Sequence, residues 1–226
     1  MARAPRRAEI TGAALVRLLA RLTEADVPES RLQFAQRLAH WLGWADAISL
    51  YGALGPVGSA PAPESAGSRP APAAAPAADP RADADQVRQQ LARQLTEPAL
   101  EAREAQDAEG FAPWRRHCNQ RQNAMERAIA PLRERLRQQL AACSPAMARL
   151  AEVDAVMEQV LAPQEQRLLA TVPGWLGKHF ERLRRSSQPG FEQDLQAVLL
   201  AELEIRFQPV EGLLEALATA QRQAST

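Results

Sequence analysis

A stretch that is poor in packing residues divides this chain of 226 residues. From Gly55 to Pro80, 22 of 26 residues are Ala, Pro, Gly or Ser, and no large apolar residue follows Val57. Such a stretch buries too little surface to offset the conformational entropy that it would lose on folding. We therefore expect residues 55–82 to form a disordered linker between an N-terminal module at 1–54 and a larger C-terminal part at 83–226.

The residues on both sides of this linker favour helices. Ala, Leu, Gln, Glu and Arg dominate, whereas glycine is sparse and runs of β-branched residues are absent. Ala, Leu, Gln, Glu and Arg are strong helix formers. The predicted fold class is all-α, with three short helices in 1–54 and an elongated helical bundle with proline kinks in 83–226.

Charge and cysteine content argue against several classes of function. The 27 basic residues balance 27 acidic ones, so no net field draws the chain to nucleic acid, and we expect no such partner. Cys118 and Cys143 lie on different predicted helices, with no CxxC and no paired His/Cys spacing. The pattern therefore predicts no disulfide, no metal site and no bound cofactor.

No targeting or membrane-spanning segment is convincing. Arg17 and Arg21 interrupt the apolar segment that a signal peptide would need. A run of about 18 apolar residues, the length that spans a bilayer, does not occur. The expected location is the cytoplasm, including the inner face of the inner membrane.

Aromatic residues gather in the N-terminal module. Four of the ten aromatics in the chain lie close together there, namely Phe34, Trp41, Trp44 and Tyr51. Large aromatics supply burial where few residues are available, so the first interpretation is a packed three-helix core. The second is an exposed aromatic groove that docks a protein partner, with these four residues as its candidate contacts.

Prolines and glycines predict where the helices of 83–226 begin, bend and end. A break is expected near Pro98, and Ser144-Pro145 resembles an N-cap followed by proline in the first turn. Kinks are expected at Pro131 and Pro163, and a turn at 188–190.

The sign of the charge alternates along these helices. Residues 111–142 carry seven Arg and two acids, whereas 146–170 carry two Arg and four acids. The segment 178–185 is basic and 191–226 is acidic. Antiparallel neighbours would thus meet opposite charge, which favours a bundle that closes on itself or on a second copy of the chain. An exposed ion pair contributes only about 0–1 kcal/mol, so this pattern selects register more than it stabilises.

Residues 175–185 predict a basic amphipathic helix. Its candidate contacts with a membrane or an acidic partner are Trp175, Lys178, Arg182, Arg184 and Arg185. In the alternative interpretation, the apolar face of this helix joins the bundle core and its charges face the acidic last helix.

The histidines, Cys118 and the acids of the last helix are weaker candidates for functional residues. His117-Cys118 could be a nucleophile or redox sensor, but adjacent helical residues point about 100° apart, so His117 is poorly placed to deprotonate Cys118. The single histidines His40 and His179 are expected at the surface or at the boundary of the core. The acids between Glu192 and Glu204 are expected on a solvated face.

One family shares these features. The stretch RLLARLTEADVPESRLQFAQRLAHWLGWADAISLYGAL resembles the N-terminal signature of proteobacterial domain-of-unknown-function family 3348, most specifically in WLGWADAISL, residues 41–50. The Ala/Pro-rich interruption, the WRRHC segment and the helical C-terminal half also fit. The family has no assigned activity and thus supplies no catalytic residue. Its members accompany OmpA-like and motor-channel-like envelope proteins in gene clusters, so the resemblance implies an accessory protein of an envelope complex.

The sequence thus predicts a non-enzymatic interaction or adaptor protein with protein partners, and self-association through the apolar stripes of 83–226. The alternative is a peripheral membrane or regulatory protein that acts through residues 175–185. A third hypothesis, which the sequence favours least, is a thiol-dependent enzyme or redox sensor at Cys118.

Overall fold

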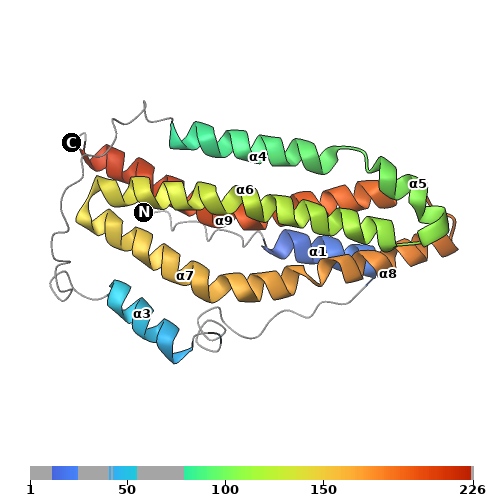
Figure 1. Ribbon diagram of the computed structural model, residues 1–226, viewed down its shortest axis with the longest axis horizontal. Coiled ribbons are helices and arrows are strands. Elements are labelled where there is room, and N and C mark those ends of the chain that lie inside the picture. Colours follow the sequence, from blue (N-terminus) through green and yellow to red (C-terminus); the bar gives the residue numbers. More distant parts are fainter. Residues whose placement is uncertain (1–11, 25–40, 42, 55–78, 225–226) are drawn as a thin grey trace, which may run out of the picture. The chain divides into compact units, whose positions relative to one another are not determined.

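The computed structural model in Figure 1 describes residues 12–24, 41, 43–54 and 79–224. These residues are helical almost throughout and contain no strand, which confirms the all-α prediction. The helices are α1 (Gly12–Thr23), α3 (Trp44–Leu54), α4 (Pro80–Thr96), α5 (Leu100–Glu109), α6 (Ala112–Cys143), α7 (Pro145–Leu169), α8 (Val172–Arg185) and α9 (Phe191–Ala224).

Contacts group the chain into two compact units. The first, here called the aromatic unit, comprises α1 with the helical segments of 88–130 and 166–208. The second, the ion-pair unit, comprises α3 with the helical segments of 80–87, 131–165 and 209–224. These units do not follow the predicted boundaries at 1–54 and 83–226. Most of the predicted linker, 55–78, lies outside the described residues, so this domain division stays a prediction.

Local sequence signals placed the helix limits well. α4 ends at Thr96, before Pro98, and Met147 N–H donates to Ser144 Oγ (3.2 Å), as expected of an N-cap. Pro131 and Pro163 lie inside α6 and α7, and Pro209 lies inside α9. The division between the two units falls immediately before Pro131 and Pro209, where the missing proline N–H interrupts the helical hydrogen bonds.

Aromatic rings form the core at one end of the aromatic unit. Phe191, the first residue of α9, packs edge-on against Phe180 of α8 and Trp114 of α6, with ring centroids 5.0 and 5.2 Å away. Phe111 completes the cluster, with its ring centroid 6.0 Å from Phe191. Edge-to-face pairs contribute about 0.5–1.5 kcal/mol beyond their burial. The cluster therefore ties α6, α8 and α9 together where the chain turns.

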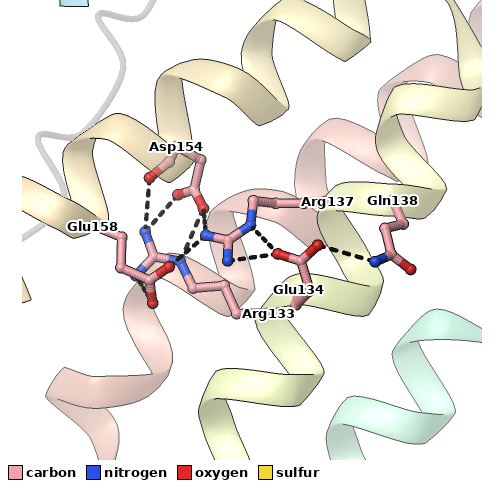
Figure 2. A network of polar contacts seen from close by, with 6 residues as sticks. All are labelled: Arg133, Glu134, Arg137, Gln138, Asp154 and Glu158. Atoms are coloured by element: carbon pink, nitrogen blue, oxygen red, sulfur yellow. Dashed lines mark hydrogen bonds and ion pairs between the residues drawn. The ribbon is translucent and has the colours of Figure 1, made fainter. Parts of the chain in front are cut away.

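The ion-pair unit joins α6 to α7 through charges (Figure 2). Arg133 donates to Asp154 from two nitrogens (2.9 and 2.7 Å), and Arg137 Nη1 reaches Asp154 and Glu158 at 3.2 and 2.6 Å. Both arginines are largely buried, with 13% and 12% of their side chains exposed, so water screens these pairs less than surface pairs. The contact confirms, for these two helices, the expected meeting of basic and acidic segments.

The close approach of α8 to Phe111 leads to a stability prediction. A Cβ added at Gly177 would lie 3.0 Å from two carbons of the Phe111 ring. That ring is packed against Phe180 and Phe191, so it cannot move aside freely. We expect Gly177→Ala to lower the free energy of unfolding by about 1–2 kcal/mol, because overpacking outweighs the helix propensity gained.

Gly174→Ala is the matched control for this substitution, to be compared by urea unfolding. Beyond the adjoining residues and backbone of α8, no atom of the described residues lies within 4 Å of a Cβ added at Gly174. This variant should therefore be neutral or more stable by up to about 1 kcal/mol. Equal stability of the two variants would show that the contact of Gly177 with Phe111 is not tight.

Candidate interaction surfaces

The helix α3 exposes most of its apolar side chains. Its N-terminus is capped by Asp46, whose Oδ2 accepts a hydrogen bond from Gly43 N–H (3.1 Å). Ile48, Tyr51 and Leu54, spaced three residues apart, are 57%, 77% and 65% exposed. An 11-residue helix so weakly buried is held little by its own packing.

The four predicted docking aromatics have different outcomes. Tyr51 is exposed, so it does not belong to a packed core, whereas Trp41 is half-buried. Phe34 and the side chain of Trp44 lie outside the described residues. The groove of four aromatics therefore stays a prediction, and the exposed apolar side chains of Ile48 and Leu54 do not belong to that aromatic set.

The apolar face of α8 is buried in the aromatic unit. Leu176, Phe180 and Leu183 are at most 8% exposed, which confirms that this face joins the core. Trp175 is 37% exposed, and Lys178 Nζ lies 4.4 Å from the centroid of its ring, a cation–π contact. Arg184 and Arg185 are exposed beyond the end of that face.

Arg182 connects α8 to α1, with which α8 is in contact. Its Nη1 lies 2.7 Å from Glu24 Oε1, and its Nη2 donates to the carbonyl of Leu22. The last carbonyls of a helix have no partner within the helix and carry negative partial charge, so a guanidinium satisfies and stabilises them. The prediction that this charge faces the acidic last helix is therefore wrong for Arg182, which faces the C-terminal end of α1.

His179 is hydrogen-bonded to the guanidinium of Arg182. It is 3% exposed, so the expectation of a surface or boundary histidine is wrong. Its Nε2 lies 2.7 Å from Asp194 Oδ2 and its Nδ1 lies 3.0 Å from Arg182 Nη2. A guanidinium only donates, so Nδ1 accepts in this arrangement and Nε2–H donates to Asp194. The sequence signal was the i, i+3 spacing of His179 and Arg182, but the partner on α9 follows only from the turn between the helices.

Glu202 is also buried where a solvated residue was expected. None of it is exposed, and its carboxylate accepts from Gln122 Nε2 (2.9 Å) and Arg206 Nε (2.9 Å). Gln122 Nε2 also lies 3.1 Å from the carbonyl of Leu169. A buried carboxylate must be hydrogen-bonded to be tolerated, so this network is a structural feature that joins α6 to α9.

Cys118 is poorly suited to thiolate chemistry. It is fully buried, and burial, with a smaller contribution from the charge of Glu202, raises the pKa of its thiol to about 12. Burial and the charge of Arg121 lower the pKa of His117. The thiol therefore stays protonated and inaccessible near neutral pH, contrary to what a nucleophile or redox sensor requires.

The described residues contain neither a candidate metal site nor a helix that could span a membrane. No three His, Cys, Asp or Glu residues within the described ranges are placed to hold a metal ion. No helix in the same ranges combines the length and apolarity needed to cross a bilayer.

The contacts of Arg182 predict that α1 loosens when this side chain is changed. Arg182→Gln removes the charge that pairs with Glu24 and faces the Leu22 carbonyl. We expect amide hydrogens of α1 to exchange about five- to tenfold faster, the effect of losing a partly exposed charged contact. Arg185→Gln is the control, because Arg185 Nε donates within α8, to the carbonyl of Glu181. Equal exchange rates in the two variants would contradict a holding role for Arg182.

Thiol labelling tests the environment of Cys118. In the folded protein, iodoacetamide should modify Cys143, which is exposed, and leave Cys118 unmodified. Because the raised pKa keeps the Cys118 thiol protonated, raising the pH from about 7 to about 9 should not change this pattern. Denaturant should make both residues react, as mass spectrometry of the peptides would show. Rapid labelling of Cys118 in the folded protein would restore the thiol hypothesis.

Comparison with known proteins identifies the family but no characterised relative. The family described as "Protein of unknown function (DUF3348)" matches residues 1–190 and 189–219, nearly the whole chain. No curated protein and no solved structure matches the chain. The resemblance seen in the N-terminal module and the WRRHC segment is thereby confirmed: the chain belongs to the DUF3348 family of proteins of unknown function.

Proposed function

We propose that this chain is a non-enzymatic interaction protein that docks on a protein partner through the exposed face of α3. The observation that supports this proposal is the exposure of Ile48, Tyr51 and Leu54 together on one short helix. Burying one large apolar side chain contributes about 1.5–3 kcal/mol, so three of them can anchor an interface. Tyrosine is also among the residues that most often dominate binding energy.

The proposed partner is a protein of a bacterial envelope complex, as the resemblance to the family implies. In this proposal, residues 1–54 supply one contact and 83–226 a second, so that the chain acts as an adaptor. Two contacts on one chain raise the effective concentration of the second binding event.

The membrane alternative has less support than docking through α3. The helix that would lie on the membrane buries its apolar face in the aromatic unit, and Arg182 is engaged with Glu24. Trp175, Lys178, Arg184 and Arg185 are the contacts that remain for it. The thiol hypothesis loses support through the burial of Cys118.

Substitution of the α3 face tests the proposal. Tagged full-length chain would be used to capture partners from detergent-solubilised native cells, with mass spectrometry as the readout. The variant Ile48→Ser with Tyr51→Ser should lose the partner, and with a purified partner its affinity should fall about 30-fold or more, as for loss of a dominant contact. Point variants are preferable to deletion of 1–54, because α1 buries Leu15 and Leu22.

The matched control is Leu150→Ser, which also removes an exposed apolar side chain, 42% exposed, but from α7. This variant should retain the partner. Recovery of the same proteins with the α3 variant would overturn the proposal. If light scattering instead shows a wild-type oligomer that the α3 variant dissociates, the face binds a second copy of the chain.

A further inference from the structure

A pocket of about 390 Å³ lies in the aromatic unit, beside the turn between α8 and α9. Its apolar lining consists of Trp114, Phe180, Leu183 and Phe191, each at most 8% exposed. These residues come from three helices, α6, α8 and α9, and α5 supplies the facing polar residues. Small-molecule sites are concave, are lined by aromatic and apolar groups with a few polar ones, and measure about 300–1,000 Å³.

Three of the seven polar side chains that line this pocket are engaged with described residues. Gln106 Oε1 accepts a hydrogen bond from Trp114 Nε1 (3.2 Å), which fixes the indole. Glu192 accepts from Ala99 N–H (2.7 Å) and pairs with Arg103 (3.3 Å). These contacts hold α5 against α6 and α9, so the walls of the pocket are formed without a ligand.

Arg184 is the exception among the basic residues of the lining. Within the described part of the chain, its guanidinium makes no ion pair or hydrogen bond. Its Nη1 lies 3.9 Å from where a Cβ would stand if Gly110 carried a side chain. A guanidinium offers paired donors that match a carboxylate. Asp107 is the other charged residue of the lining that pairs with no described residue, and it would repel ligands of higher negative charge.

We propose that this pocket binds an apolar, ring-bearing monocarboxylate, with the ring against Trp114, Phe180 and Phe191 and the carboxylate on Arg184. Two sources share this chemistry, a free small acid and the C-terminal residue of a peptide. The site is independent of the α3 face, so failure of one proposal leaves the other untouched.

The first test uses N-acetylphenylalanine and its amide as probes. Two-dimensional NMR would follow the indole N–H of Trp114, assigned with Trp114→Phe, and calorimetry would give the affinity. The acid should shift this signal and bind about tenfold or more tightly than the amide, because a charge-assisted contact with Arg184 is lost in the amide. Arg184→Ala should remove the difference between acid and amide, and the control Arg185→Ala should preserve it.

A short peptide that ends in phenylalanine with a free carboxylate distinguishes the two sources. Tighter binding of the peptide than of N-acetylphenylalanine would identify a peptide C-terminus as the ligand, whereas weaker binding would favour a free small acid. The proposal is overturned if neither acid shifts the Trp114 signal at millimolar concentration, or if acid and amide bind equally in the wild type.

Discussion

The ring of Phe191 is the contact on which the aromatic unit depends. It stands at the start of α9 and meets the rings of Phe180 and Trp114 edge-on, at 5.0 and 5.2 Å between centroids. The same packing brings Gly177 of α8 against Phe111, where no larger residue fits without displacing the ring. Three helices therefore meet around one side chain, and both the pocket and the turn between α8 and α9 are built on it.

Polar contacts then attach further elements to this core. Asp194, three residues after Phe191 in α9, accepts a hydrogen bond from His179. His179 in turn accepts from Arg182 of α8, which contacts the C-terminal end of α1. Both ring nitrogens of His179 therefore have a hydrogen-bond partner, and a polar side chain that keeps its hydrogen bonds can be buried at little cost in free energy. The position of α1 is thus linked to the start of α9 through side chains and not through the backbone between them.

The surfaces that remain exposed carry the functional proposals. The α3 face is apolar and weakly buried, whereas the pocket beside Arg184 combines an aromatic lining with a cation that has no ion pair among the described residues. Neither needs a reactive group, and the residue that looked most reactive in the sequence, Cys118, is buried with a raised thiol pKa. Both proposals therefore concern binding, and neither includes a chemical reaction.

Local chemistry determined where the helices lie. Helix limits are marked by Ser144-Pro145, Pro98 and the glycine turn before Phe191, because capping and proline geometry act within a few residues. The opposite charges of α6 and α7 could also be predicted, because the charge of each helix follows from its own residues. Only the tertiary structure decided which polar side chains are buried. His179 and Glu202 look like surface residues in the sequence, because Asp194 and Gln122, their partners on another helix, lie at positions that no local pattern specifies. The local partners Arg182 and Arg206, three and four residues further along the same helix, do not by themselves imply burial.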